Sequence, residues 1–411
     1  MRNQENITGL ALAPYLRNVN IQWDHVNISD ILEMDFDPAE RRKYALTDGD
    51  LLVCEGGEVG RTAIWRGELA ECYIQNAVHR VRPLTSKEEG RFLFYVFYAV
   101  ANLGVFEAEV NRSTIGHLTS EKLKKYRFMF PPLKEQRTIA TFLDREAARI
   151  NSLIAKKERL IELLQEKRAA LISHAVTRGL DPTVPVKDSG VEWLGEIPAH
   201  WDVKRLKFAA SFFGGGTPFK ENIEYWSGDI PWVSPKDMKA EIIRDTEEHI
   251  TKGAIDDSST RLVLPGTVLI VVRSGVLRHS IPVAINVRPM ALNQDMKAIV
   301  PKPFLKPEYL AFVIRGHQGA LLVEWRKEGA TVESIEYELL VNTSCPIPPL
   351  SEQHAIATYL DSKTAKIDAL ISRIREGIEK LKEYSSALIS AAVMGKIDMR
   401  GAIASQDDEH L

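Results

Sequence analysis

The sequence has only three cysteines among 411 residues, at positions 54, 72 and 345. Their spacing fits neither a disulfide framework nor a metal-binding motif, so a reducing compartment and a cytoplasmic location are expected. No apolar run is long enough to span a membrane, and the N-terminus has no signal-peptide pattern, so no membrane partner is expected. Lysine plus arginine (53) nearly balance aspartate plus glutamate (56). Any DNA contact would therefore depend on local basic patches.

Recognisable catalytic motifs are also scarce. The glycines of FGGGTP, residues 213–218, are not followed by Gly-Lys-Ser/Thr, so a tight turn is favoured over a phosphate-binding loop. No strand–GxGxxG–helix unit for a dinucleotide is present. The spacing of His25, His79 and His117 does not suit a metal site, and no nucleophile–base pair stands out. These absences favour a binding protein without a metal or cofactor of its own.

What the sequence does contain is a repeat. Residues 131–181 (PPLKEQRTIATFLD to LISHAVTRGLD) align without a gap with residues 348–398 (PPLSEQHAIATYLD to LISAAVMGKID), an offset of 217 with about half the positions identical. Such self-similarity indicates a duplicated module. The same offset relates the more divergent flanking regions through the pairs Pro14 and Pro231, Gly49 and Gly266, Leu52 and Leu269, Leu93 and Leu310, and Thr114 and Thr331.

Both copies have the apolar spacing of a long helix. The seam residues of the first copy are Ile139, Leu143, Ile150, Ile154, Ile161, Leu164 and Leu171, and those of the second are Ile356, Leu360, Ile367, Leu370, Ile371, Ile378, Leu381 and Leu388. This pattern predicts two helices of about 40 residues, roughly 60 Å long, that pair with each other. The alternative is that each helix packs only on its own domain, which its length and single seam disfavour.

The repeat divides the chain into segments. We expect globular units at 1–130 and 193–347, long helices at 131–180 and 348–400, a linker at 181–192 and a polar tail at 401–411. In the first unit the pattern predicts a strand at 50–54, a glycine-rich loop that runs into a second strand within 55–65, further strands at 73–78 and 126–130, and a helix at 91–105. Residues 193–217 have no counterpart, because residue 1 aligns with residue 218. The first unit is therefore expected to be an N-terminally shortened form.

Several loops combine side chains suited to nucleic acids. Arginine pairs well with guanine edges, asparagine and glutamine with adenine, and basic side chains with phosphates. For any one of these residues the alternative is an ordinary solvated loop position. The candidates are Arg17, Asn18, Arg61, Gln75, Asn76, Arg112, Ser113 and Thr114 in the first unit, and Ser234, Lys236, Arg273, Ser274, Arg278, Asn293, Gln294 and Thr331 in the second.

The chain resembles the specificity subunits of type I restriction–modification systems. Besides the two PPL-containing motifs, the matching segments are VEWLGEIPAHWDVKRLK at 191–207, GGTP at 215–218 and YWSGDIPWVSPKDM at 225–238. The resemblance implies an α+β fold with two mixed α/β target-recognition domains, separated by two long antiparallel coiled-coil helices in a pseudo-twofold arrangement. Each domain would read half of a bipartite site in double-stranded DNA, and the helices would set the spacer.

The resemblance also implies partners and a non-catalytic role. Two methyltransferase subunits would carry S-adenosylmethionine, and two motor–nuclease subunits would use ATP and magnesium. Three alternatives remain at this stage. The chain could be a coiled-coil scaffold for proteins, a half-functional specificity subunit that acts as a dimer, or an enzyme with an unrecognised site, such as a fused nuclease.

Overall fold

The computed structural model describes residues 11–84, 86–108, 117–327 and 331–397. The chain divides into two compact units. Unit 1 comprises Met1–Glu158 and Ile374–Leu411, and unit 2 comprises Arg159–Arg373. Each unit therefore contains one globular part and a portion of each long helix. Across the described ranges, no helix is long and apolar enough to cross a membrane.

The two long helices are α5 (Leu133–Arg178) and α11 (Leu350–Val393), with 46 and 44 residues. Both begin directly after a proline pair, because proline lacks the N–H that a helix interior needs. Gly179 ends α5 with a φ of +73°, and Gly395 follows α11 with a φ of +67°. Glycine reaches this left-handed conformation without strain, which suits it to a helix C-terminus. Each helix is about 70 Å long, slightly longer than predicted.

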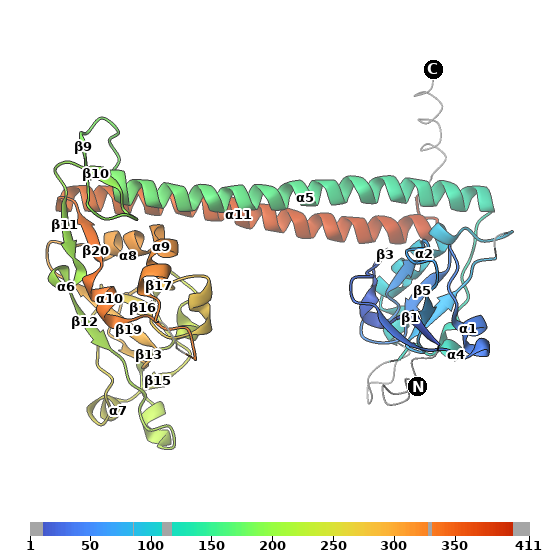
Figure 1. Ribbon diagram of the computed structural model, residues 1–411, viewed down its shortest axis with the longest axis horizontal. Helices are drawn as coiled ribbons and strands as arrows, with labels where there is room; N and C mark the ends of the chain where they lie inside the picture. Colours follow the sequence, from blue (N-terminus) through green and yellow to red (C-terminus); the bar gives the residue numbers. More distant parts are fainter. Residues whose placement is uncertain (1–10, 85, 109–116, 328–330, 398–411) are drawn as a thin grey trace. The chain divides into compact units, whose positions relative to one another are not determined.

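The helices run antiparallel within each unit (Figure 1). In unit 1, Ile139 of α5 shares a core with Ile389 of α11. In unit 2, Ile172 of α5 shares a core with Ile356 of α11. The N-terminal part of one helix thus meets the C-terminal part of the other. The predicted seam residues are buried or half-buried, except for the exposed Leu370.

The globular part of unit 2 is built on a five-stranded sheet and a three-stranded sheet. The five strands, in spatial order, are β12 (Ala210–Gly214), β19 (Met296–Pro301), β16 (Val268–Val271), β17 (Val283–Asn286) and β14 (Ile242–Ile243). The three strands are β15 (His249–Ile250), β13 (Ile230–Val233) and β18 (Ala291–Leu292), of which β13 and β18 are parallel. Helices α8 (Pro307–Gly316) and α9 (Gln318–Trp325) contribute to the core shared with α5 and α11.

Smaller elements complete unit 2. Strand β11 (Asp202–Arg205) pairs with β20 (Ser344–Ile347), and β10 (Glu196–Pro198) pairs with β9 (Val186–Asp188). Strand β9 falls within the segment 181–192 that was expected to be a linker, so part of that segment is a folded hairpin. The remaining elements are α6 (Leu206–Ala209), η3 (Ile223–Trp226), η4 (Pro235–Asp237), α7 (Lys252–Asp256), η5 (Gly275–Arg278) and α10 (Tyr337–Asn342).

Unit 1 has smaller sheets with related strand order. One contains β6 (Thr62–Ile64), β5 (Leu51–Cys54) and β8 (Val78–Val81), and the other contains β4 (Leu32–Asp35), β1 (Leu12–Leu16) and β7 (Tyr73–Ile74). Strands β2 (Ile21–Gln22) and β3 (His25–Val26) form a hairpin. The helices are α1 (Pro38–Tyr44), η2 (Asn18–Asn20), α2 (Gly90–Asn102), α3 (Val105–Ala108) and α4 (Ser120–Leu123).

Three predictions for unit 1 need correction. The strand predicted at 73–78 is instead β7 followed by the first residue of β8, with residues 75–77 outside both strands. The helix predicted at 91–105 ends at Asn102, and a turn separates it from α3. The strand predicted at 126–130 is absent, and these residues are irregular. Their counterparts in unit 2 form β20 only by pairing with β11, and unit 1 has no counterpart of β11 among its described residues. A strand needs a partner, so the same kind of segment is irregular here.

The constant offset of 217 residues is also wrong for part of the globular units. The register of β5 and β8 sets Val53 opposite His79. The register of β16 and β19 sets Ile270 opposite Lys297. The offset is therefore 217 for the first strand of each pair and 218 for the second. One extra residue between these strands in unit 2 explains the difference.

A buried glutamine side chain joins the globular part of unit 1 to α5. Gln136 is 0% exposed. Its Nε2 donates to the carbonyls of Lys87 and Pro131 at 2.9 and 2.8 Å, and its Oε1 accepts from the N–H of Glu89 at 2.9 Å. Glu89 is the residue before α2. One amide thus fixes the proline turn, the start of α5 and the start of α2.

Unit 2 repeats this arrangement with Gln353, which is also 0% exposed. Its Nε2 donates to the carbonyls of Phe304 and Pro348 at 2.9 and 2.8 Å, and its Oε1 accepts from Lys306 N–H at 2.8 Å. Every partner is offset by 217 from its counterpart in unit 1. The glutamine of the PPL-containing motif is therefore a structural residue in both copies.

Replacing Gln353 by alanine should remove three hydrogen bonds and leave buried backbone groups unpaired. We expect the free energy of unfolding of unit 2 to fall by about 3 kcal/mol, measured by denaturant titration. The neighbouring exposed residue His354 provides the control, because His354→Ala should change that free energy by less than about 0.5 kcal/mol. Similar small losses for both variants would contradict the structural role of Gln353.

His317, the residue after α8, is expected to make the stability of unit 2 depend on pH. Its ring is buried against Trp193, its Nδ1 lies 3.1 Å from Val313 O, and its Nε2 lies 3.0 Å from Thr177 Oγ1. Burial lowers the pKa of His317 below its ordinary value of 6.5, although the bond to the Val313 carbonyl acts the other way. A histidine with a lowered pKa stabilises the fold above its unfolded pKa, and this stability is lost as the pH falls below about 6.5.

The free energy of unfolding should therefore fall more steeply between pH 7.5 and 5.5 in the wild-type chain than in His317→Gln. Thermal unfolding of unit 2 followed at several pH values measures this difference. The exposed His279 supplies the comparison, since His279→Gln should leave the pH profile of the wild type unchanged. Parallel profiles for wild type and His317→Gln would refute the assignment.

Candidate nucleic-acid interface

Two parallel strands bring the candidate loops of unit 2 together. Strands β13 and β18 set Val233 beside Leu292, and Asn293 N–H donates to Val233 O at 2.9 Å. Because parallel strands end at the same edge of a sheet, the residues after both strands share one region. Ser234 follows β13, and Asn293 follows β18.

Ser234 and Lys236 have different roles in the turn after β13. The Ser234 hydroxyl is buried and donates to Asp237 Oδ2 at 2.8 Å, which holds the first turn of η4. Lys236 lies on that turn and is exposed. Ser234 therefore shapes the loop, and Lys236 presents a charge to solvent.

The loop after β18 is joined to the loop after β16 by an ion pair. Arg273 Nε lies 2.6 Å from Asp295 Oδ1, and Asp295 N–H donates to Asn293 Oδ1 at 2.7 Å. Asn293 is buried and acts within the loop. Gln294 is exposed and accepts a hydrogen bond from the Thr217 hydroxyl. Arg273 and Gln294 thus lie at the surface on a scaffold held by Asn293 and Asp295.

Glu333 adds a third loop to this region. Its carboxylate lies 3.5 Å from Arg278 and 3.4 Å from Arg326, and its carbonyl accepts from Ser274 N–H at 3.0 Å. Thr331 is exposed on the same loop. We name the set of residues 234–238, 273–278, 293–295 and 331–334 the unit 2 loop cluster. It contains all eight residues predicted for unit 2.

The five predicted residues of unit 1 that the structure describes gather at the equivalent sheet edge. Strands β1 and β7 are parallel, and Gln75 N–H donates to Leu16 O at 3.3 Å. Arg17 and Asn18 follow β1, while Gln75 and Asn76 follow β7. Residues 17–18, 56–61 and 75–76 form the unit 1 loop cluster. Arg112, Ser113 and Thr114 lie outside the described residues.

The arginines of the unit 1 loop cluster bind mostly to the protein itself. Arg17 lies 2.7 Å from Asp30, and Arg61 lies 3.1 Å from Glu58. Arg61 also donates to Asn18 O at 3.0 Å, and Asn18 Nδ2 donates to the Gly56 carbonyl at 3.2 Å. Both guanidinium groups therefore organise the loops, and the exposed Asn76 presents its amide near Tyr44 Oη.

The same cluster holds unpaired buried polar atoms. Among the described residues four buried side-chain atoms have no hydrogen-bond partner, and three of them are Arg17 Nε, Asn18 Oδ1 and Arg61 Nε. Buried polar atoms are normally paired, so their concentration in one loop cluster requires a physical reason. Ligand binding provides such a reason. A loop that exchanges its internal hydrogen bonds for bonds to a polar ligand would give these atoms partners.

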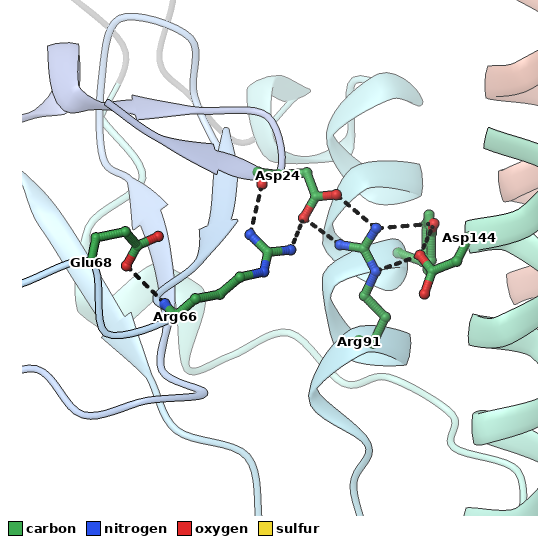
Figure 2. Close-up of polar contacts among 6 residues, drawn as sticks. Asp24, Arg66, Glu68, Arg91 and Asp144 are labelled. Carbon is green, nitrogen blue, oxygen red and sulfur yellow. Dashed lines mark hydrogen bonds and ion pairs between the residues drawn. The ribbon is translucent and has the colours of Figure 1, made fainter. Parts of the chain in front are cut away.

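Sequence reasoning missed the charged centre of unit 1 (Figure 2). Arg91 of α2 donates to Asp24 Oδ2 at 2.7 Å and to Asp144 Oδ1 of α5 at 2.6 Å, and Arg66 lies 2.8 Å from Asp24 Oδ1. Burial alone would lower the pKa of Arg91, but the hydrogen bonds that Arg91 donates to the carboxylates of Asp24 and Asp144 raise this pKa above its ordinary value. The partners are far apart in sequence, and no local pattern marks them.

No group of three histidine, cysteine, aspartate or glutamate side chains within the described ranges is placed to hold a metal ion. The geometry instead consists of two loop clusters, each at the end of a parallel strand pair. Such clusters can contact an extended polar ligand along a surface. The loops of both clusters combine amide and basic side chains, which suit base edges and phosphates.

Comparison with known proteins assigns the family. The family described as "Type I restriction modification DNA specificity domain" matches residues 21–163 and 198–380, which is more than half of the chain. The chain belongs to this family. The resemblance inferred from the sequence motifs is thus confirmed, and so is the α+β fold with two related units.

Individual relatives agree with this assignment. The specificity subunit of the type I restriction enzyme EcoR124I/EcoR124II from Escherichia coli is 36% identical over 203 residues, which are 49% of this chain and 46% of that protein. The MjaIX specificity subunit from Methanocaldococcus jannaschii is 34% identical over 198 residues, 47% of this chain and 44% of that protein. Each of these matches thus spans about half the length of the curated relative.

A solved structure supports the fold over a longer range. A chain from work on complex assembly and conformational transition of the type I R-M system superposes with a TM-score of 0.71 at 19% identity. The match covers 93% of this chain and 91% of that one. At this identity the similarity concerns the fold alone.

The two loop clusters predict different effects for two arginines. Arg61→Ala should lower the free energy of unfolding of unit 1 by about 2 kcal/mol, because Asn18 O and Glu58 lose a charged donor. Arg278 forms an exposed ion pair with Glu333, so Arg278→Ala should change the free energy of unfolding of unit 2 by less than about 0.5 kcal/mol. In DNA titrations at several salt concentrations, Arg278→Ala should make the slope of log affinity against log salt concentration shallower by about 1, since one phosphate contact is lost. A large stability loss for Arg278→Ala would assign it to folding.

Proposed function

We propose that this chain is a DNA specificity subunit in which each globular unit reads one half of a bipartite site and which catalyses no reaction itself. One observation carries the proposal. Equivalent parallel strands in the two units end in equivalent loop clusters, but the side chains on those clusters differ. A shared scaffold with different loop side chains is suited to reading two different sequences.

The exposed residues of the unit 2 loop cluster suit direct contact with a duplex. Gln294 can pair with an adenine edge, and Lys236 and Arg278 can contact phosphates. Arg273 can pair with guanine once its bond to Asp295 is exchanged. Asn293 and Ser234 are buried and would instead hold the loops in shape.

In unit 1 the proposed reading residues are Gln75 and Asn76, whose amides can pair with adenine. Arg17 and Asn18 are supported by their position beside this amide pair and by their unpaired buried atoms. Contact with DNA would give these atoms partners. Arg61 holds the loop from which Asn18 projects.

The long helices are proposed to set the spacing between the half-sites and to carry partner subunits. Membership of the family supports a complex with modification and restriction subunits. We propose two methyltransferase subunits that carry S-adenosylmethionine and two motor–nuclease subunits that use ATP and magnesium. This chain would then need no cofactor of its own.

A protein scaffold without a DNA role is the competing function. Binding through phosphates releases counterions, so the affinity for DNA should fall steeply between 50 and 200 mM salt. A scaffold that touches no phosphates would show no such dependence. The family assignment favours DNA recognition.

Shortening the helices tests the spacing role. In unit 1, the Cβ position of Gly377 lies 3.6 Å from Lys157 Nζ, so these parts of α11 and α5 are opposite each other. Deletion of residues 154–160 together with 375–381 removes one heptad from each helix, about 10 Å. We expect the gap between half-sites to shorten by about 3 base pairs while the half-site sequences stay the same.

A control chain carries a different heptad of equal length at both positions and should keep the original gap. Selection of bound duplexes from a random library measures gap and half-sites in one experiment. An unchanged gap in the shortened chain would contradict the spacing role, and altered half-sites would show that the deletion disturbs the loop clusters.

A further inference from the structure

A half-buried lysine lies next to the unit 2 loop cluster without an anionic partner. Lys297 is the second residue of β19, and β19 follows directly after Asp295 of the cluster. The Lys297 Nζ makes no hydrogen bond or ion pair with another residue in the described ranges. Burial lowers the pKa of Lys297 below its ordinary value, and no acidic side chain counteracts this shift. A partly desolvated ammonium group without an anion is unfavourable, so this position requires a physical reason.

An aromatic ring holds the ammonium group in place. Lys297 Nζ lies 4.2 Å from the centroid of the ring of Tyr337, the first residue of α10. The Tyr337 ring meets the ring of Phe212 of β12 edge-to-face, with centroids 6.2 Å apart and planes at 85°. Helix α10 lies beside β12 and β19 (Figure 1). The attraction between a cation and a ring face fixes the charge but leaves ammonium hydrogens available to an anion.

Two chain segments connect this lysine–tyrosine pair to the loop that follows β16. Ile335 N–H donates to Val272 O at 2.8 Å, which brings the start of α10 to that loop. Val272 N–H donates to Asp295 O at 2.8 Å, which joins the segment before β19 to the same loop. Tyr337 is 43% exposed, so the pair borders on solvent. The cation therefore lies at the margin of the loops that are proposed to read bases.

In unit 1 the corresponding strand position holds a histidine. His79 of β8 lies opposite Val53, as Lys297 of β19 lies opposite Ile270. The His79 Nε2 forms a hydrogen bond with the carbonyl oxygen of Leu118, so this ring is used within the fold. A fixed cation at this strand position is therefore a feature that distinguishes unit 2 from unit 1.

We propose that Lys297, held over the Tyr337 ring, contacts a backbone phosphate of the DNA that unit 2 reads and so positions the duplex on the unit 2 loop cluster. This inference rests on the proposed function and adds to it a contact that carries no base information. The phosphate supplies the anion that the ammonium group lacks within the protein. Because the ring and the sheet fix the cation in advance, little side-chain freedom is lost on binding.

Lys297→Met removes the charge and keeps a flexible side chain beside Tyr337. The probe is a two-part duplex that the wild-type chain selects from a random-sequence library. Lys297→Met should weaken binding to this duplex about tenfold and make the slope of log affinity against log salt concentration shallower by about 1. The selected motif should stay the same, because a phosphate contact does not depend on the base.

Two controls separate this effect from general changes in charge or folding. Lys302 is exposed just beyond the other end of β19, about 17 Å along the strand. Lys302→Met removes the same charge there and should leave the salt slope unchanged. Thermal unfolding of the free Lys297→Met chain should occur at no lower temperature than in the wild type, because a partly desolvated charge is removed.

A phosphate scan locates the contact. Methylphosphonate linkages, each of which removes one phosphate charge, are placed singly along the selected duplex. At one linkage the wild-type chain should lose about tenfold in affinity, whereas Lys297→Met should lose nothing further, because the contact is already absent. At the other linkages the two losses should multiply. Tyr337→Leu should reduce the sensitivity to the same linkage, and Tyr337→Phe, which keeps the ring, should retain it.

The outcomes distinguish this inference from the proposed function. Selection of no motif by the wild-type chain would contradict the proposed function and this contact with it. If a motif is selected, an unchanged salt slope for Lys297→Met would overturn the phosphate contact alone. Losses that multiply at every linkage would also overturn it, because a side chain that only packs would weaken all contacts alike. A changed motif would assign Lys297 to base reading instead.

Discussion

The structure depends on one buried amide in each unit. Gln136 and Gln353 each bond to two carbonyls and one N–H that belong to the proline turn and to the start of α2 or α8. A buried amide is stabilising only when its partners are in place, so it fixes the globular part on the long helix. The strand pairs β1–β7 and β13–β18 belong to these globular parts. The amide therefore positions each loop cluster relative to the helix portions of its own unit.

Charged networks reinforce this attachment differently in the two units. In unit 1, Arg91 connects Asp24 to Asp144 of α5 (Figure 2). In unit 2, Glu241 lies 2.7 Å from Arg168 of α5 and 2.9 Å from Arg315 of α8. The glutamine contacts are the same in both copies, whereas the ion pairs are not. The two copies of the duplicated module thus share the glutamine contacts that join the globular part to the long helix, while their globular parts differ.

Sequence reasoning succeeded where a local pattern determines structure. The helices followed from the seam and the proline pairs, and the strand at 51–54 from its apolar run. It failed where a segment forms a strand only by pairing with a residue range far away in the sequence. Residues 126–130 are irregular because the described part of unit 1 contains no counterpart of β11 to pair with them. Among the described residues, the candidate loops lie together in each unit because parallel strands align their ends. The internal bonds of Arg61 and the role of Gln136 could not be predicted, because their partners are remote in the sequence.

In the proposed function, the two loop clusters read two different half-sites at a fixed separation. The most direct measurement is selection of duplexes from a random-sequence library by the purified full-length chain, followed by sequencing of the bound DNA. We expect the bound duplexes to share a two-part motif with unlike halves and one constant gap. Enrichment of no motif, or of an uninterrupted motif without a gap, would contradict it.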